Sequence, residues 1–295
     1  MSAVTETGTA EPRPLLRVAV PNKGALADAA AEMLREAGYA QRTDPKELLL
    51  LDEPNGVEFF YLRPRDIAVY VGEGTLDVGI TGRDMLLDSG AAATEVMPLG
   101  FGRSRFRFAA PAGADLTVED LHDLRLATSY PGLVGSYLKE RGVITRLISL
   151  DGAVETAIRL GVADVIADVV ETGSTLRQAG LELFEDPILE SEAILIRRSR
   201  AEVPPGLGQL ERRVNGVLVA RNYVMMDYDV SDDVVEQACA ITPGLESPTV
   251  SPLARPGWHA VRAMVPRTAA QQIMDDLWDI GARAILVTDI AACRL

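Results

Sequence analysis

The sequence predicts an α/β protein with two α/β lobes, followed by a separate C-terminal unit of the order βαββαβ. Short apolar runs alternate with amphipathic helical patterns through residues 15–200, which is typical of sheets covered by helices. A polar stretch with several Pro and Gly residues at 199–209 then indicates a linker. The chain has 295 residues, 47% of them hydrophobic, which is enough to form the cores of two or three domains.

The first lobe is expected to begin after a disordered tail, residues 1–14, that is polar and ends near Pro14. Residues 15–20 (LLRVAV) predict a strand, and residues 27–37 predict a helix that Gly38 ends. Further elements of this lobe are predicted as strands at 47–51, 57–62 and 76–81, and as helices at 65–71 and from residue 82.

The second lobe repeats the alternation of strands and helices. Residues 106–113 predict a strand that crosses between the lobes, and residues 190–198 predict the returning strand. The elements between them are predicted as helices at 117–122, 132–141, 152–160 and 176–184, and as strands at 124–129, 146–150 and 164–170. We therefore expect lobe 1 to comprise 15–110 and 188–200, and lobe 2 to comprise 111–187. Two such lobes predict a ligand cleft between them, at the carboxyl ends of the strands.

The C-terminal unit is expected at residues 212–295, after a linker at 201–211. Its predicted strands are 214–228, 247–254, 258–265 and 283–290, and its predicted helices are 231–241 and 268–280. This βαββαβ order is typical of a ferredoxin-like (ACT-like) domain. The second helix is expected to bury Ile273, Met274, Leu277 and Trp278, with Gly281 following its C-terminus.

Bulk properties exclude several classes of protein. No apolar run reaches the roughly 18 residues that a membrane span needs, and the polar N-terminus has no apolar segment typical of a secretory signal. The net charge of −14 argues against nucleic-acid binding and predicts a small positive cleft on an acidic surface. Cys239 and Cys293 are too few for a disulfide framework, and we expect both to be reduced in the cytoplasm.

Residues 155–176 carry the strongest functional signal. The apolar run VADVIADVV is broken by Asp168 and leads into Thr172, Gly173, Ser174 and Thr175 before a helix-like pattern. Glycine allows close backbone approach, and hydroxyls together with the N–H groups of a helix start bind phosphate. Asp168 at the strand end is placed to accept from sugar hydroxyls or to bind a metal. The segment thus predicts a phosphorylated-ribose site, and an N-capped helix without a ligand is the alternative.

The spacing of this segment resembles the signature of ATP phosphoribosyltransferase, the first enzyme of histidine biosynthesis. The matching positions are Glu155, Gly161, Ala163, Ile166, Asp168, Thr172, Gly173, Thr175 and Leu176. The resemblance covers residues 17–295 and is closest to the long, actinobacterial form, which carries its own regulatory domain. It implies a two-lobed catalytic region like that of periplasmic binding proteins.

The resemblance also implies the reaction and its regulation. Adenine N1 of ATP attacks C1 of phosphoribosyl pyrophosphate, and pyrophosphate leaves, with Mg²⁺ as cofactor. L-Histidine is the implied feedback inhibitor, and the implied quaternary structure is a homo-oligomer, as dimer and hexamer.

The resemblance assigns site residues in the two lobes. Lys23 and Asp168 are the implied catalytic residues, while the metal ligands stay unassigned. The implied phosphoribosyl pyrophosphate site is Asp168, Val169, Thr172, Gly173, Ser174, Thr175 and Leu176, and the implied ATP site includes Lys23, Gly24, Asp84 and Tyr130. Arg63 is added to the ATP site from the sequence itself, because Arg63 and Arg65 flank Pro64 and either one reaches a phosphate or is a solvated surface charge. Tyr130 either stacks on adenine or packs in the core. Many family members have Arg where this chain has Ala25, so a pyrophosphate anchor is either missing or supplied by another basic residue.

In the C-terminal unit, the resemblance implies a histidine site in which Asp229 pairs with the ligand. The other implied residues are Leu245, Ser247, Thr249 and Ala284. A structural role is the alternative, because Asp229 precedes a helix and Pro243-Gly244 is a turn signal. His122 and His259 have no supporting Asp or Cys in the sequence and are interpreted as structural.

Two other classes of function remain open at this stage. A two-lobed solute-binding protein would be expected to have a signal peptide, and a non-catalytic amino-acid-sensing regulator would be expected to have a basic DNA-binding segment. The phosphate-type loop at 168–176 favours catalysis over both.

Overall fold

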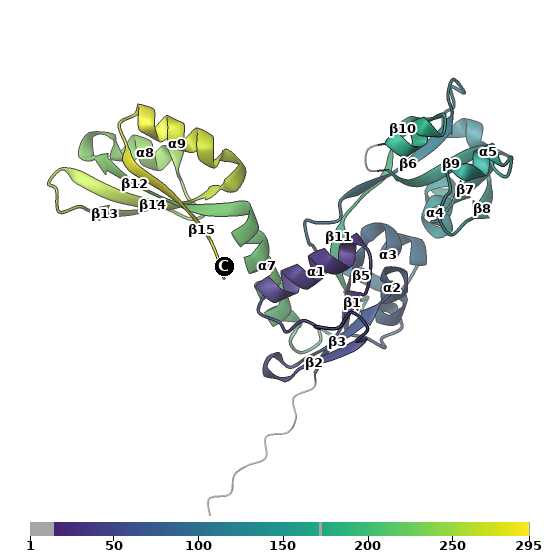
Figure 1. Cartoon of the computed structure of the whole chain (residues 1–295), viewed down its shortest axis with the longest axis horizontal. Helices are drawn as coiled ribbons and strands as arrows, with labels where there is room; N and C mark the ends of the chain where they lie inside the picture. Colours follow the sequence, from purple (N-terminus) through teal and green to yellow (C-terminus); the bar gives the residue numbers. More distant parts are fainter. Residues whose placement is uncertain (1–14, 171–172, 295) are drawn as a thin grey trace, which may run out of the picture. The chain divides into compact units, whose positions relative to one another are not determined.

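The computed structural model describes residues 15–170 and 173–294. The chain forms two compact units, Met1–Arg35 with Tyr39–Gly208, and Glu36–Gly38 with Gln209–Leu295. The first unit contains two separate sheets and therefore two lobes, as predicted, and the second unit contains a third sheet (Figure 1). The expected tail at 1–14 lies outside the described residues.

The sheet of lobe 1 has the strand order β2-β3-β1-β4-β11-β5. Its central strand β1 pairs in parallel with β3 and β4, and Val18, Ala19 and Val20 of β1 are fully buried. Apolar neighbours on both faces explain why this strand is a continuous apolar run. The strands are β1 (Leu16–Pro21), β2 (Leu49–Asp52), β3 (Val57–Leu62), β4 (Val78–Gly82), β5 (Ala93–Pro98) and β11 (Ala193–Arg198).

Three helices accompany this sheet: α1 (Ala25–Glu36), α2 (Pro64–Gly72) and α3 (Arg83–Ser89). Helix α1 buries the apolar face that its periodicity predicts, including Met33 and Leu34. Helix α2 packs so closely on the sheet that a Cβ on Gly79 of β4 would overlap the Ile67 side chain. A short 3₁₀ turn, η1 (Glu53–Asn55), connects β2 to β3.

The sheet of lobe 2 has the order β10-β6-β9-β7-β8, and its strands enclose a core that includes Phe106, Phe108 and Tyr130. Its strands are β6 (Ser104–Pro111), β7 (Arg125–Thr128), β8 (Arg146–Ser149), β9 (Val165–Val170) and β10 (Leu181–Ser191). Its helices are η2 (Glu119–Leu121), α4 (Pro131–Glu140), α5 (Thr156–Arg159) and α6 (Ser174–Gln178).

The chain passes from the first sheet to the second before residue 110, where the boundary was expected. It returns to the first sheet after residue 188, the other expected boundary. Strand β6 was expected to cross between the lobes, yet along its whole length it pairs antiparallel with β9 and β10 of the second sheet. The crossing segments are therefore residues 99–103 and Glu192. Pro111 and Gly113 mark a turn within lobe 2 rather than a crossing, because Ala112 N–H donates to the Gly180 carbonyl.

Two elements of these lobes differ from the sequence expectation. The helix expected at 176–184 ends at Gln178, because Gly180 takes a φ of +74° and Leu181 and Leu183 then pair with β6 as strand β10. Strand β5 was not predicted, and its residues are mostly half-buried at the edge of the sheet, where apolar alternation is weak.

The C-terminal unit has an antiparallel sheet of order β13-β14-β12-β15, the arrangement of a ferredoxin-like domain, as predicted. Its strands are β12 (Tyr223–Ser231), β13 (Thr249–Pro252), β14 (Trp258–Pro266) and β15 (Arg283–Asp289). Its helices are α7 (Leu207–Asn222), η3 (Asp232–Val234), α8 (Val235–Ile241), η4 (Arg267–Ala269) and α9 (Ala270–Asp279). Helices α8 and α9 lie on the same face of this sheet (Figure 1).

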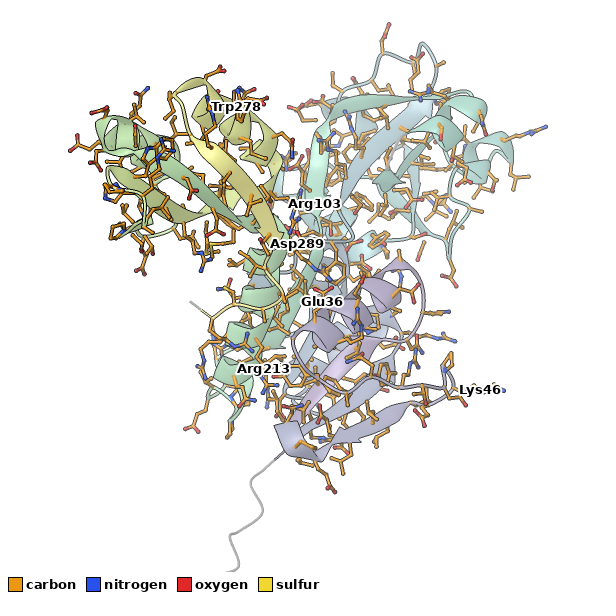
Figure 2. All side chains as sticks on the ribbon, turned by 60° about the vertical axis from the view of Figure 1, so that its left-hand side comes forward. Glu36, Lys46, Arg103, Arg213, Trp278 and Asp289 are labelled. Carbon is orange, nitrogen blue, oxygen red and sulfur yellow. The ribbon has the colours of Figure 1, made fainter. Side chains whose placement is uncertain are left out.

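Two predictions for this unit were wrong. Helix α7 occupies residues 207–211 of the expected linker and residues 214–222 of the strand expected at 214–228, because Leu210, Val214 and Val217 form a buried helical stripe. Trp278 was expected to be buried but is 57% exposed, since the buried stripe of α9 passes through Leu277 and leaves Trp278 beside it (Figure 2). Within residues 15–170 and 173–294, no helix has the length and apolarity needed to cross a bilayer.

Candidate active site

The two lobes enclose a cleft of about 400 Å³ to which both contribute side chains. Four of the residues expected at the site, Asp84, Tyr130, Asp168 and Val169, line this cleft. The other lining residues are Ala25, Leu26, Arg65, Gly82, Met85, Gly102, Arg103, Ser104, Ser129, Asp151 and Gly152. The cleft therefore brings together residues that lie more than 140 positions apart in the chain.

Asp168 lies near the end of β9 and accepts a hydrogen bond from the Val169 N–H at 2.8 Å. Burial raises the pKa of this carboxyl, and the negative charge of Glu155 raises it further. The Val169 N–H and the positive charge of Arg65 act in the opposite direction. Asp168 thus lies in a partly desolvated position, where a hydrogen-bond donor on a ligand interacts strongly with its carboxyl group.

The phosphate-type loop lies directly beside Asp168. Gly173 has a φ of +69°, which is the left-handed region, and α6 starts at the next residue. A second cavity of about 410 Å³ is lined by Glu155, Asp168, Val169, Val170, Gly173, Ser174, Thr175 and Leu176. Asp168 and Val169 line both this cavity and the cleft, so one carboxylate faces the loop and the opposite lobe. Thr172 lies outside the described residues.

Asp84 is held at the cleft wall by a residue of the second lobe. Its carboxylate accepts a hydrogen bond from the Ser191 hydroxyl at 2.9 Å, and the same hydroxyl oxygen accepts from the Asp84 N–H at 3.0 Å. The side chain folds over Gly82, where a Cβ would overlap the Asp84 carboxylate. Glycine at position 82 therefore allows a buried acid at the start of α3.

Tyr130 belongs both to the core of lobe 2 and to the cleft wall. Its ring packs edge-on against Phe106, with centroids 5.1 Å apart, and the Arg65 guanidinium lies 4.3 Å from its centroid. Burial raises the pKa of the Tyr130 phenol, and the negative charge of Asp84 raises it further. The hydroxyl therefore stays protonated at neutral pH and is a hydrogen-bond donor within the cleft.

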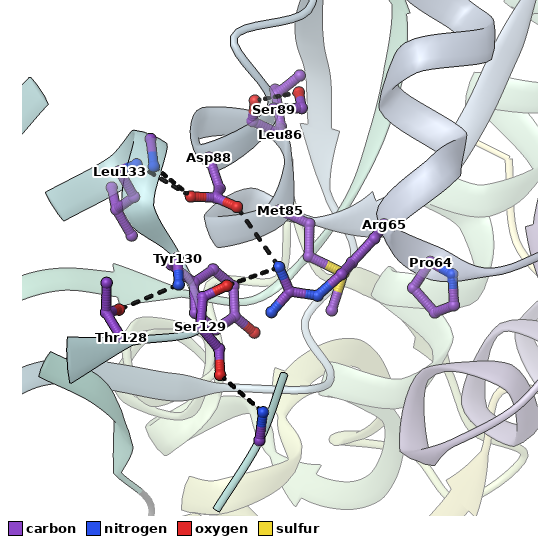
Figure 3. Close-up of polar contacts among 12 residues, drawn as sticks. Pro64, Arg65, Met85, Leu86, Asp88, Ser89, Thr128, Ser129, Tyr130 and Leu133 are labelled. Atoms are coloured by element: carbon purple, nitrogen blue, oxygen red, sulfur yellow. Dashed lines mark hydrogen bonds and ion pairs between the residues drawn. The ribbon is translucent and has the colours of Figure 1, made fainter. Parts of the chain in front are cut away.

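Arg65 and Asp88 join the two lobes across the cleft (Figure 3). The Arg65 guanidinium donates to the Ser129 carbonyl at 2.8 Å and lies 3.4 Å from Asp88 Oδ2. The other oxygen, Asp88 Oδ1, accepts from the backbone N–H groups of Gly132 at 2.9 Å and Leu133 at 3.1 Å. These are N–H groups of the first turn of α4, which have no partner within their own helix. We call these five residues the interlobe clamp.

Three residues expected at the ATP site lie apart from this cleft wall. Lys23 and Gly24 are exposed and precede Ala25, the first residue of this segment that lines the cleft. Arg63 is exposed in the residue before α2. Arg103 and Asp151 also line the cleft, although no sequence motif singles them out.

Comparison with known proteins decides the family. Residues 63–216 match the ATP phosphoribosyltransferase family, and residues 220–292 match the family described as HisG, C-terminal domain. An ATP phosphoribosyltransferase of Streptomyces coelicolor is 63% identical over 285 residues, covering 95% of this chain and 100% of the relative. That of Arthrobacter sp. (strain FB24) is 61% identical over 286 residues, with the same coverage.

The chain belongs to the ATP phosphoribosyltransferase family. It is therefore a phosphoribosyltransferase, a transferase of histidine biosynthesis, and the resemblance stated from the sequence is confirmed. Among solved structures, the ATP phosphoribosyl transferase (HisG:HisZ) complex from Thermotoga maritima has a chain with a TM-score of 0.59 and 27% identity. It covers 69% of this chain, and this chain covers 98% of it.

The C-terminal domain of this ATP phosphoribosyltransferase divides the five expected histidine-site residues into two groups. Asp229 lies on β12 opposite Arg283 of β15, next to Ala284, which takes a φ of +51°. Leu245 and Ser247 lie in the connection to β13, and Thr249 is the first residue of β13, which β14 separates from β12. Asp229 and Thr249 nevertheless lie on the same face of the sheet, opposite the buried face of β12.

The described residues provide no ready-made metal site. Between residues 15 and 294, outside 171–172, no three His, Cys, Asp or Glu side chains come together as potential ligands. The fold gives His259 an acidic neighbour: its Nδ1 lies 3.0 Å from an Asp232 carboxylate oxygen, although without hydrogen-bond geometry. The pairing of β12 with β14 brings these residues together from 27 positions apart in sequence.

Proposed function

We propose that this phosphoribosyltransferase joins adenine N1 of ATP to C1 of phosphoribosyl pyrophosphate and releases pyrophosphate, the first step of histidine biosynthesis. One observation carries the proposal: Asp168 and Val169 line both the cavity of the phosphate-type loop and the interlobe cleft. A phosphoribosyl group bound at the loop would thus present its ribose to the second substrate in the cleft.

The proposed roles follow from the chemistry of each group. Gly173, Ser174, Thr175 and Leu176, together with Thr172, bind the 5-phosphate through hydroxyls and backbone N–H groups. Asp168 accepts hydrogen bonds from the ribose diol. Asp84 of lobe 1 and the Tyr130 hydroxyl of lobe 2 face the nucleotide in the cleft.

The arrangement needs no nucleophile of its own, because the attacking atom belongs to ATP. The ribose develops positive charge as the bond to pyrophosphate breaks, and the Asp168 carboxylate, which lines the cleft, stabilises that charge. Holding both substrates in one cleft lowers the activation barrier further, because the two substrates then react within one complex instead of having to meet in solution. Lys23, Gly24 and Arg63 are proposed to contact phosphates from the edge of the cleft.

Mg²⁺ is the proposed cofactor. This ion usually binds through one or two carboxylates together with substrate phosphates rather than in a cage of protein ligands. The cleft fits that pattern, because it contains the carboxylates of Asp84, Asp151 and Asp168 without a three-ligand cluster among the described residues. Any of these carboxylates would hold the ion, and the bound ion would neutralise the leaving pyrophosphate.

Regulation by L-histidine is proposed at Asp229, Leu245, Ser247, Thr249 and Ala284. Asp229 is half-buried on the face of the sheet that the helices leave open, which suits a carboxylate that binds an ammonium or imidazolium group. We also propose a homo-oligomer that changes between dimer and hexamer. A cytoplasmic location agrees with the free thiols of Cys239 and Cys293.

A coupled assay tests the proposed reaction. The purified protein is mixed with ATP, phosphoribosyl pyrophosphate, Mg²⁺ and pyrophosphatase, and the ultraviolet absorbance of the ribosylated product is followed. Asp168→Ala is expected to lower kcat/KM by about 100-fold or more, because a charged interaction with the reacting sugar is lost. Asp186→Ala, which removes an exposed carboxylate from the same lobe, is the control. Absence of turnover in the wild-type protein would reject the reaction, and normal turnover in Asp168→Ala would reject the role of Asp168.

A further inference from the structure

Three arginines gather where the chain crosses between the lobes, and they differ in how they are paired. A cavity of about 760 Å³ beside the cleft is lined by Arg83, Arg103 and Arg105. Arg83 donates to both oxygens of Glu95, at 2.8 and 2.9 Å, and lies 3.6 Å from Glu192. Arg105 lies 3.3 Å from Glu190. Arg83 is therefore neutralised within the protein, while Arg105 has an acidic neighbour at the surface.

Arg103 has no such partner in the part of the chain that the structure describes. Its side chain is exposed, and it lines both this cavity and the interlobe cleft (Figure 2). The second cation of the cleft, Arg65, is already held by the Ser129 carbonyl and Asp88. Arg103 is thus the cation of the cleft wall whose five N–H donors are available to a ligand.

The backbone that carries Arg103 is fixed on both sides. Leu99 N–H donates to the Ala193 carbonyl, and Ala193 N–H donates to the Phe101 carbonyl, so residues 99–101 are held against β11. Gly102 has a φ of +64°, and a Cβ there would overlap the Leu26 side chain. Strand β6 then begins at Ser104. Because this backbone is already ordered, a ligand that binds Arg103 needs to order only the side chain and not the loop.

We infer that Arg103 binds the polyphosphate chain of a substrate, an inference that rests on the proposed function. A guanidinium binds phosphate oxygens through two parallel N–H donors, and the match is best for an oxygen-rich, strongly charged chain. Such chains occur in the proposed substrates as the triphosphate of ATP and the diphosphate of phosphoribosyl pyrophosphate. Ala25, which lines the same cleft, contributes no charge, so Arg103 supplies a basic group to that wall.

The chain offers a matched control for this inference. Arg105 is two residues further along, is also exposed and lines the outer cavity, but it does not line the cleft and is paired with Glu190. Arg103→Ala and Arg105→Ala remove the same charge from neighbouring positions. Arg103→Lys keeps the charge and loses the two-donor geometry.

The experiment measures binding and turnover separately. Dissociation constants of ATP, phosphoribosyl pyrophosphate and inorganic tripolyphosphate are determined by calorimetry for the full-length protein and its variants, and KM values come from the coupled assay. Arg103→Ala is expected to weaken the binding of one substrate by about 10- to 100-fold, which is the effect of losing one charge-assisted interaction. Arg103→Lys is expected to lose less binding affinity. Weaker ATP and tripolyphosphate binding identifies the triphosphate as the ligand, and weaker phosphoribosyl pyrophosphate binding alone identifies the diphosphate.

Equal affinities in Arg103→Ala and Arg105→Ala for all three ligands would overturn the inference. Because calorimetry does not depend on turnover, this result is distinguishable from a failure of the proposed reaction, in which even the wild-type protein produces no product.

Discussion

The carboxylate of Asp88 accepts a hydrogen bond from the backbone N–H of Gly132 at 2.9 Å, so a residue at the end of α3 in lobe 1 caps the start of α4 in lobe 2. Tyr130, the residue before α4, has no side-chain cap of its own for that helix. The second lobe therefore depends on the first to satisfy its helix start, and the width of the cleft is coupled to this one carboxylate.

Replacing Asp88 by Ala is expected to lower kcat/KM about 10-fold. The change removes the cap of α4 and one partner of Arg65, so Ser129 and Tyr130 lose their position relative to Asp84. The free energy of unfolding should fall by about 1 kcal/mol, the usual effect of losing a helix cap. Steady-state kinetics and urea unfolding measure the two effects. Asp66→Ala, which changes an exposed acid of α2, should leave the kinetics unaltered, and equal kinetics for both variants would contradict the role of the clamp.

Gly132→Ala tests how closely the lobes approach. A Cβ at this position would overlap the backbone carbonyl oxygen of Asp88, so the two helices must separate to accept it. We expect a loss of at least about 1 kcal/mol of stability and a higher KM for the substrates. Gly135→Ala is the matched control in the same helix, because its nearest neighbour is a Leu147 methyl group at 3.4 Å. That variant should be neutral or up to about 1 kcal/mol more stable.

Asp168→Asn should separate activity from stability. Burial raises the pKa of Asp168 in the folded protein, so the fold favours the neutral form of this group and is destabilised by its charge at neutral pH. A neutral amide of the same shape is therefore expected to raise the melting temperature at pH 7 by about 1–3 °C, while turnover is lost. The gain should shrink as the pH falls through the raised pKa, where the wild-type group also becomes neutral. A lower melting temperature at pH 7 would refute this account.

Asp164→Asn is expected to have the opposite dependence on pH. Asp164 accepts two side-chain hydrogen bonds from Arg125, at 2.6 and 3.0 Å, and this pairing lowers its pKa to about 2. The stabilisation is present above the unfolded pKa of about 4 and is lost as the pH falls from about 4 to about 2. Because both side chains are 38% exposed, we expect Asp164→Asn to lower the free energy of unfolding by less than about 1 kcal/mol at pH 7. Urea unfolding at pH 7 and pH 3 measures the difference, with Glu140→Gln of α4 as the control.

Asp229→Ala is expected to raise the L-histidine concentration that gives half inhibition by about 10-fold or more, because it removes a half-buried carboxylate. Turnover without histidine should not change. Asp233→Ala removes an exposed carboxylate of η3 nearby and should leave inhibition as in the wild type. Full inhibition of Asp229→Ala at wild-type histidine concentrations would move the sensor site elsewhere.

Much of the fold was predictable because burial leaves a periodic pattern. The apolar runs of β1 and β9 and the helical stripe with Met33 and Leu34 were recognisable from the sequence alone. Strand β10 was mistaken for a helix because its residues alternate only partly between buried and exposed, and because Glu185 interrupts the pairing with β6 at a bulge. Helix α7 was missed because Pro and Gly before it suggested that the linker continued.

The candidate site was predictable where local spacing defines it and unpredictable where the fold assembles it. Asp168 and Gly173 lie within one short segment whose spacing points to a phosphoribosyl group. The contact of Asp84 with Ser191 joins positions 107 residues apart, and no local pattern indicates such a pair. Arg103 carried no signal in sequence because its significance comes from the absence of a partner among the described residues.

Strand β11 lies between β4 and β5, although lobe 2 separates it from both in the chain. During synthesis, β5 has no neighbour with which to pair until residue 198 has left the ribosome, by which time all of lobe 2 has emerged. The inserted lobe can thus assemble before the lobe that carries it, and the newly made chain exposes the edges of β4 and β5 in the meantime. Those two edges are where the growing polypeptide is most exposed to aggregation, and where a chaperone would be of most use.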